Sequence, residues 1–188
     1  PYAAYAIGAA LVDTEIQVTD AELATMNVEK GMMTLVDQAR QRDILTTLSD
    51  HLIRANHASG GSAGNSMIAT AMMGAPTYMS CKVAEDADGD IYLADLEASG
   101  VAHGLTERST DGVTGKCIVL ITPDAERSLN THLGISETLS TDEVDEAAIK
   151  DSEWVYLEGY LVTSPTGHAA ALKTKALAEV NGVKTAVS

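Results

Sequence analysis

The sequence predicts an α/β fold in which a mostly parallel sheet carries a small β appendage. Apolar runs typical of buried strands alternate with segments of helical length along most of the 188 residues. A few early stretches alternate polar and apolar residues instead, which is typical of strands with one solvated face. A glycine-rich stretch, residues 58–74, leads into a helix of small apolar residues. These three features favour one open sheet with helices on its faces and extra strands inserted early.

The glycine-rich stretch contains the most specific local pattern of the chain. Residues 60–65 read Gly-Gly-Ser-Ala-Gly-Asn, and side chains this small let backbone N–H groups approach a ligand closely. A loop of this kind before a helix N-terminus can bind anions and hydroxyl groups. For a Gly-Gly pair taken alone, a tight turn before a buried helix is the more common explanation. The helix is predicted to end at Gly74, which is followed by Pro76.

Composition excludes several function classes. Hydrophobic residues make up 45% of the chain while aromatic residues make up 4% and Phe is absent, so the core must be aliphatic. The formal net charge of −15 repels nucleic acid and anionic lipid, so we expect neither a nucleic-acid nor a membrane partner. No apolar run reaches transmembrane length. Cys81 and Cys117 lie in apolar segments without metal-site spacing, which favours reduced, buried thiols of a cytoplasmic protein.

The first predicted strand carries a candidate binding residue. Residues 5–13 are predicted to form one buried strand that passes through Gly8 and ends at Asp13. A carboxylate at a strand end is well placed to accept hydrogen bonds from sugar hydroxyls, although a solvated turn residue is the alternative. Residues 14–19 alternate polar and apolar side chains and predict a strand with one wet face.

The segment before the glycine-rich stretch is predicted to be a strand followed by a helix. Residues 32–36 form a short apolar run whose two methionines, Met32 and Met33, are predicted to fill the core. Asp37 is predicted to cap a helix over residues 38–52. Residues 53–58 then return the chain to the glycine-rich stretch.

An acidic loop follows the next strand, residues 77–83. Residues 85–90 read Glu-Asp-Ala-Asp-Gly-Asp and resemble half of a calcium loop, but the glycine stands at the wrong position and no closing Glu follows. A capped turn into a helix over residues 91–99 explains the same residues better. An edge strand is predicted from Val101.

The C-terminal third continues the alternation of strands and helices. Residues 112–130 predict a hairpin, with Arg127 after its turn as either a binding group or a plain surface residue. Ser140 and Glu143 have capping-box spacing and predict a helix through Lys150. The remaining predicted elements are a strand over 154–159 that reaches Glu158, a helix over 164–180 and a strand over 183–187.

Three candidate groups are predicted to meet at one edge of the sheet. Ligands of open α/β sheets bind outside the carboxyl ends of the strands. Asp13, the glycine-rich stretch and Glu158 all fall at or near such ends in this interpretation. This convergence favours a binding site over three unrelated turns.

The ordered set of motifs resembles the N-terminal half of the PfkB/ribokinase family of carbohydrate and nucleoside kinases, with its adenosine-kinase-like members as the most similar branch. The motifs are residues 8–13 (Gly-Ala-Ala-Leu-Val-Asp), 60–65, 86–89 (Asp-Ala-Asp-Gly), 114–115 (Thr-Gly) and 127–130 (Arg-Ser-Leu-Asn). The resemblance covers the whole chain. It implies a three-layer α/β/α sandwich with a small β-sheet lid, whose strands are inserted at about 14–36 and 101–130.

The resemblance also implies a function and a set of site residues. The activity would be phosphorylation of a sugar or nucleoside hydroxyl, with ATP and Mg as cofactors and a possible homodimer through the lid. Arg127 would lie near the phosphates. The implied sugar- or ribose-binding residues are Asp13, Gly60, Gly61, Ser62, Asn65 and Glu158.

Two departures from the family pattern qualify this prediction. Ala9 stands where nucleoside-kinase members carry Asn, which removes one polar contact and argues against adenosine itself. The second family signature, an Asp-Thr-x-Gly-Ala-Gly-Asp stretch that supplies the anion hole and the catalytic base, is not in this sequence. A parallel sheet that stopped at residue 187 would also leave an unpaired apolar edge. We therefore expect residues 1–188 to be the N-terminal part of a longer kinase, with the nucleotide-binding part and catalytic base elsewhere.

Two other functions were weighed against the kinase. A non-catalytic sugar- or nucleoside-binding module would fit if the chain ended at residue 188. A dinucleotide-binding oxidoreductase fits poorly, because no Gly-x-Gly-x-x-Gly loop follows the first strand.

Overall fold

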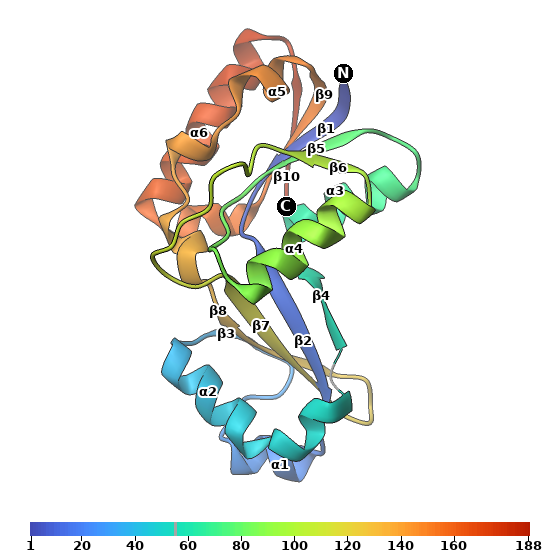
Figure 1. Ribbon diagram of the computed structural model, residues 1–188, viewed down its shortest axis with the longest axis vertical. Helices are drawn as coiled ribbons and strands as arrows, with labels where there is room; N and C mark the ends of the chain where they lie inside the picture. Colours follow the sequence, from blue (N-terminus) through green and yellow to red (C-terminus); the bar gives the residue numbers. More distant parts are fainter. Residues whose placement is uncertain (55) are drawn as a thin grey trace.

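The computed structural model describes residues 1–54 and 56–188, and it contains two five-stranded sheets (Figure 1). We call the first the body sheet and the second the lid sheet. The strand order of the body sheet is β10-β9-β1-β5-β6, with β1 Tyr2–Ile7, β5 Thr77–Ser80, β6 Val101–His103, β9 Ser152–Leu157 and β10 Lys184–Val187. The order of the lid sheet is β3-β8-β7-β2-β4, with β2 Leu11–Gln17, β3 Met33–Leu35, β4 Asn56–Gly60, β7 Gly115–Ile121 and β8 Arg127–His132.

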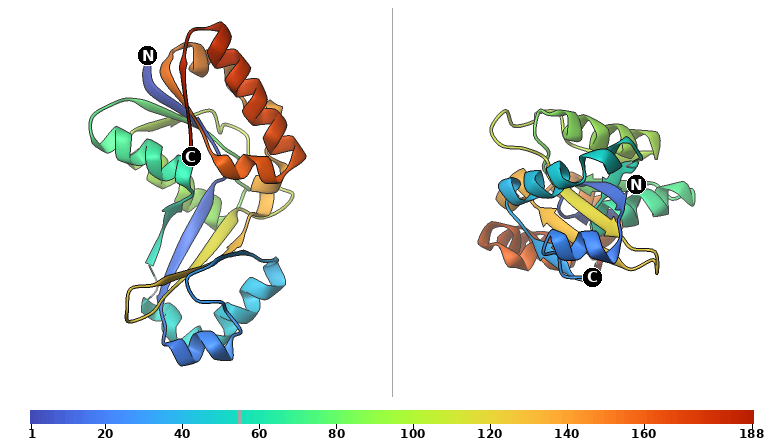
Figure 2. Two further views of the ribbon diagram at one scale, coloured as in Figure 1. Left: turned by 180° about the vertical axis from the view of Figure 1, so that it is seen from behind. Right: turned by 90° about the horizontal axis from the view of Figure 1, so that it is seen from below.

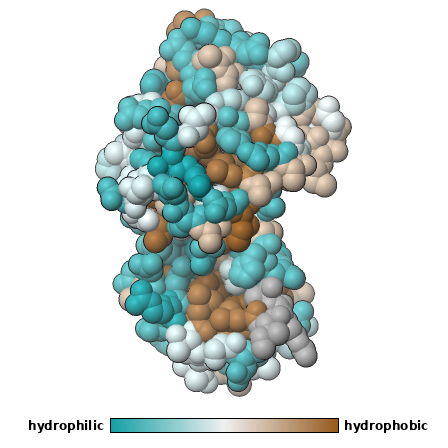
Figure 3. All heavy atoms as spheres, viewed as in Figure 1, coloured by the Kyte–Doolittle hydropathy of each residue, from teal (hydrophilic) through white to brown (hydrophobic). Residues whose placement is uncertain are grey.

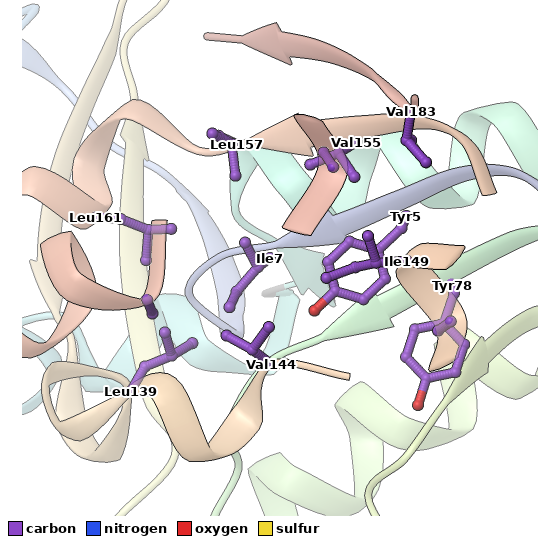
Figure 4. Packing of buried hydrophobic residues seen from close by; sticks show 13 residues of the cluster. Tyr5, Ile7, Tyr78, Leu139, Val144, Ile149, Val155, Leu157, Leu161 and Val183 are labelled. Atoms are coloured by element: carbon purple, nitrogen blue, oxygen red, sulfur yellow. The ribbon is translucent and has the colours of Figure 1, made fainter. Parts of the chain in front are cut away.

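The body sheet is parallel throughout and has helices on both faces (Figure 1). Tyr5 and Ile7 of β1 pack against α5 (Glu146–Lys150) and α6 (Pro165–Val180), and Figure 4 shows these side chains beside Val155 and Leu157. Ala6 of β1 points the opposite way, toward α3 (Ser62–Met72) and α4 (Ala87–Ala98). Because successive strand residues face opposite sides, β1 supplies two separate cores. The predicted three-layer α/β/α sandwich is confirmed.

The lid sheet is mixed, and among the described residues α-helices cover one of its faces. The cover comes from α1 (Asp20–Thr25), α2 (Gln38–Thr47) and the 3₁₀ helix η1 (Ser49–Arg54), and α4 also contacts β2 and β4. Ile16, Ile44 and Ile118 form the centre of a small aliphatic core between them and the sheet. Figure 2 shows the lid as a separate lobe joined to the body through a narrow waist. We use the term lid for the lid sheet together with α1, α2 and η1.

Helix starts follow the capping signals of the sequence. Asp37 caps α2 and accepts a hydrogen bond from the Arg40 backbone N–H at 2.7 Å, as predicted. Ser164 caps α6, with Pro165 in the first turn. The hairpin of β7 and β8 is also confirmed, because the two strands pair antiparallel. The α2 segment is shorter than predicted, since the α-helix ends at Thr47 and the chain continues as η1.

The prediction of one strand over residues 5–13 is wrong. The segment forms two strands that belong to different sheets, β1 in the body and β2 in the lid, with residues 8–10 between them. A Cβ on Gly8 would lie 2.6 Å from Ala63 Cβ and from Glu158 Oε2, so only glycine fits where the chain leaves the body sheet. Asp13 consequently lies inside β2, where it pairs with Cys117, and not at a strand end.

Other boundaries differ from those predicted. The β6 strand pairs with β5 in the body sheet, so the second lid segment comprises β7 and β8 and not residues 101–130. The α4 helix begins at Ala87 because Asp86 caps it. The predicted helix from the Ser140 capping box is two short helices, η3 (Thr141–Glu143) and α5, since Val144 between them is extended. Of the segment predicted over residues 53–58, Ala55 lies outside the described residues.

The surface is consistent with the composition. Figure 3 shows mostly hydrophilic side chains on one face of the molecule, with apolar areas in both lobes. Within residues 1–54 and 56–188, no helix combines the length and apolarity that crossing a bilayer requires. Cys81 and Cys117 are free and buried, as predicted.

Candidate functional site

A cavity of about 350 Å³ lies between the carboxyl end of the body sheet and the open face of the lid sheet. It is the place where the predicted site residues meet. Those that line it are Asp13, Gly61, Ser62, Asn65, Arg127 and Glu158. Gly60 adjoins the site, because a Cβ there would overlap the Asp13 carboxylate. Asp13 and Glu158, which are more than 140 residues apart in the chain, thus line the same cavity.

Asp13 presents its carboxylate to the cavity from the middle of β2. Its backbone neighbours are Cys117 of β7 and Ala58 of β4. Burial and, to a smaller extent, the Glu15 carboxylate raise the pKa of Asp13 from 3.8 to about 6, while Arg127 opposes the shift. No hydrogen bond from the described residues contributes to this pKa. The carboxylate is therefore a hydrogen-bond acceptor available to a ligand.

Arg127 lies at the first position of β8, on the same side of the lid sheet. Its Nη2 donates to Glu15 Oε1 at 2.6 Å, and its side chain is 59% exposed. Glu15 is two residues from Asp13, so the two carboxylates point to the same face of β2. The guanidinium is thus held near the cavity by a partner that an anionic ligand could replace.

The glycine-rich stretch forms the turn from β4 into α3. Gly61 is the N-cap of α3 with φ of +88°, a conformation that glycine adopts without strain. A Cβ at this position would also lie 2.6 Å from the Ala9 carbonyl oxygen. The backbones of the turn and of the link between the two sheets are therefore in contact. Ser62 and Asn65 follow in the first turn of the helix and face the cavity.

Glu158, the residue after β9, is 3% exposed and is bonded to the protein itself. Its Oε1 accepts from the Ala9 backbone N–H at 3.2 Å. Its Oε2 accepts from Ser62 Oγ and from the Ala63 backbone N–H, both at 3.0 Å. The position of this residue on the cavity wall was predicted, but these three protein partners were not.

The apolar half of the cavity was missed by the sequence analysis. Its side chains come from the open lid face and from the 3₁₀ segments η2 (Gly134–Thr138) and η4 (Gly159–Thr163) and their flanks. Met33, predicted to fill the core, is 37% exposed and lines the cavity, and Met32 is 50% exposed. The period-two alternation of β3 and β8 was the available signal. The apolar residues are Leu11, Met33, Leu35, Leu129, Leu133 and Leu161.

Comparison with known proteins assigns the family. The model of the pfkB family of carbohydrate kinases matches residues 30–188. The chain belongs to this family. A probable sugar kinase from Rhizobium etli CFN 42 is 30% identical with a TM-score of 0.90, over 99% of this chain and 55% of that one. An adenosine kinase from Sinorhizobium meliloti is 32% identical with a TM-score of 0.90, over 99% of this chain and 56% of that one.

Among curated proteins, mouse ribokinase is 26% identical over 126 residues, which are 67% of this chain and 38% of the ribokinase. The pfkB-family chain described here therefore spans about half the length of the solved relatives and less of the curated one. The predicted resemblance to the N-terminal part of this family is confirmed.

The acidic loop of this pfkB-family chain caps a helix, and its carboxylates bind other parts of the chain. Asp86 accepts hydrogen bonds from Gly89 and from Thr114. Asp88 pairs with Lys116 at 2.8 Å, and Asp90 pairs with Arg108. Among the described residues, no group of three or more His, Cys, Asp or Glu side chains could hold a metal ion.

Proposed function

We propose that this pfkB-family chain supplies the substrate-binding part of a kinase that transfers a phosphoryl group from ATP to a nucleoside hydroxyl. The cavity wall carries polar groups from Asp13, Asn65 and the α3 turn, together with apolar side chains such as Leu35 and Leu129 of the lid. The polar groups suit ribose hydroxyls, and the apolar side chains suit the flat face of a base. A free sugar would leave Leu35 and Leu129 facing water, so a nucleoside uses more of the cavity.

Asp13 carries this proposal. A carboxylate in the cavity with no hydrogen bond from the described chain can accept two hydroxyl hydrogen bonds from a ribose. Holding the ribose in this way would orient one hydroxyl for attack on the terminal phosphate. We place the catalytic base in the part of the family domain that this chain does not span.

The proposed roles of ATP and Mg rest on the family. The described residues offer no protein cluster for the metal, which fits a Mg²⁺ ion bound mainly through phosphates and water. Arg127 is the candidate phosphate ligand, and it would have to exchange Glu15 for the phosphate.

Asp13→Asn tests the proposal in the full-length protein. The amide keeps the shape of the side chain but removes its charge, and a hydrogen bond to a charged group contributes about 1.5–3 kcal/mol. We expect KM for the nucleoside to rise roughly 10- to 100-fold. Asp43→Asn on the outer surface of α2 is the control and should leave KM unchanged. An unchanged KM in Asp13→Asn would contradict the assigned role of Asp13.

Two further proposals concern the setting of this reaction. The free thiols of Cys81 and Cys117 support a cytoplasmic enzyme. The homodimer through the lid stays a prediction, for which the unpaired edge of strand β3 is the available surface.

A further inference from the structure

The Glu158 carboxylate joins three segments that together form the cavity. It follows β9 of the body sheet. Through Oε1 it binds Ala9, in the link that leads from the body sheet into the lid. Through Oε2 it binds Ser62 and Ala63, in the first turn of α3. One side chain therefore ties the end of a body strand to the lid link and to the glycine-rich turn.

Burial makes these bonds necessary for Glu158. A carboxylate that is 3% exposed is costly unless donors compensate for its lost hydration. Here two backbone N–H groups and one hydroxyl do so, and the N-terminus of an 11-residue helix adds a favourable dipole. Both oxygens are engaged by the protein, which leaves less capacity for a substrate hydroxyl than Asp13 has.

The backbone around Glu158 is shaped to accept it. Gly8 leaves the space that the carboxylate occupies, since a Cβ there would lie 2.6 Å from Oε2. Gly61 allows the α3 turn to approach the Ala9 carbonyl oxygen in the same way. Two glycines from distant parts of the chain thus bring Ala9 and Ala63 within reach of one carboxylate.

We infer that Glu158 is a positioning residue, which fixes the lid link and the α3 turn relative to each other and does not itself bind the sugar. The inference rests on the proposed function, because it concerns the same cavity. Asp13 lies four residues after Ala9, and Asn65 lies two residues after Ala63. A change at Glu158 therefore shifts the two polar walls of the cavity against each other.

Glu158→Gln is the test, with Glu153→Gln as the control. Glu153 lies on β9, the strand that ends just before Glu158, and its side chain is exposed, so the control removes the same charge without touching the three bonds. In Glu158→Gln one oxygen becomes an NH₂ donor that must face another donor. We expect KM of the full-length kinase for the nucleoside to rise about tenfold or more, and by the same factor for its 2′- and 3′-deoxy analogues.

The analogues separate positioning from direct binding. If Glu158 bound a ribose hydroxyl, the effect of Glu158→Gln would disappear with the analogue that lacks that hydroxyl, and the inference would be overturned. An unchanged KM in a folded Glu158→Gln would overturn it too, because the carboxylate would then only stabilise the fold. If Glu158→Gln does not fold, Glu158→Asp tests the positioning role instead. Asp keeps the charge, but its shorter side chain cannot reach both Ala9 and Ala63.

Amide hydrogen exchange gives a readout that needs no activity. Exchange at Ala9 and Ala63 should be faster in Glu158→Gln than in Glu153→Gln, and equal rates would overturn the inference. A wild-type protein that phosphorylates no nucleoside and no sugar would contradict the proposed function, while the exchange rates would still report on the three bonds.

Discussion

The body sheet and the lid sheet differ in how helices cover their faces. The body sheet is parallel, and helices pack on both faces of its central strands. The lid sheet is mixed, and the lid helices cover the face that carries Ile16 and Ile118. Parallel sheets are normally buried on both sides, whereas mixed and antiparallel sheets can leave one side open. The body is thus built for stability, and the open lid face is free to contact a ligand.

This difference separates core residues from cavity-facing residues within a single strand. In β2 the side chains of Thr14 and Ile16 are buried on the helical side. Asp13 and Glu15 alternate with them and face the cavity side. The lid can therefore change its ligand contacts without losing its core. In β1, by contrast, Tyr5 and Ile7 are buried in one core and Ala6 is buried in the other.

Truncating one buried isoleucine in each region is expected to give the largest effects. Ile149 of α5 and Ile44 of α2 are both fully buried, in the body core and the lid core respectively. Replacing either by Ala should cost about 2–5 kcal/mol of local stability. We expect Ile149→Ala to lower the free energy of global unfolding, and Ile44→Ala to increase hydrogen exchange in the lid strands alone. Exchange mass spectrometry on both variants measures this.

The outcome decides whether the lobes unfold independently. If Ile44→Ala increased exchange in β1 and β9 as much as in β2, body and lid would be a single cooperative unit. Body and lid would then differ in architecture but would not unfold separately.

The sequence predicted the helices and strands better than the contacts that form the site, for a physical reason. Apolar runs, helix caps such as Asp37 and Ser164, and terminal glycines are local signals, and they located most strands and helices. The site depends on contacts between distant segments. The bond from Ala9 to Glu158 spans 149 residues, and nothing near Ala9 in the sequence indicates it.

The error at Asp13 has a similar origin. Residues 5–13 form one continuous apolar run, and periodicity does not reveal that the run passes from one sheet to another. The chain changes sheets at Gly8, whose space is filled by the distant Glu158 and Ala63. The motif resemblance selected Asp13, which lines the cavity, because the resemblance depends on order along the chain and not on the strand boundaries.

Leu35 and Leu172 provide a matched pair for the next largest effect. They are 53% and 55% exposed, Leu35 at the cavity on the lid and Leu172 on the body helix α6. Replacing either leucine by Ala should change the free energy of unfolding by less than about 0.5 kcal/mol. For the nucleoside, we expect Leu35→Ala to raise KM roughly three- to tenfold, since about 1 kcal/mol of apolar contact is lost, and Leu172→Ala to leave it unchanged.

Steady-state kinetics with a nucleoside and with a free sugar sharpens this test. The sugar does not extend to the lid leucines in the proposed arrangement, so its KM should respond little to Leu35→Ala. Equal effects on both substrates would contradict a base-binding role for the lid.

The smallest expected effect comes from two carboxylates, one in the body and one in the lid, whose pKa values are shifted in opposite directions. In the body, burial by itself would raise the pKa of Asp86, but hydrogen bonds from Thr114 and Gly89 hold it below 3.8. In the lid, burial raises the pKa of Asp13 to about 6. Native Asp86 therefore binds its proton less tightly than the unfolded chain does, and native Asp13 binds its proton more tightly.

The two groups should consequently give opposite pH dependences of stability. Asp86 contributes to the free energy of unfolding above about pH 4, and this contribution is lost as the pH falls below that value. The difference in free energy of unfolding between wild type and Asp86→Asn should therefore become smaller in acid. Between about pH 4 and pH 6 the native state keeps the Asp13 proton that the unfolded chain releases, so the stability of wild type relative to Asp13→Asn should fall as the pH rises. Solvent screens the partly buried Asp13 carboxyl, so we expect no more than about 1 kcal/mol. Urea unfolding from pH 3 to pH 7 measures both slopes. Slopes of the same sign would mean that the lid carboxylate is held by partners in the folded protein as the body carboxylate is, and is not free for a ligand.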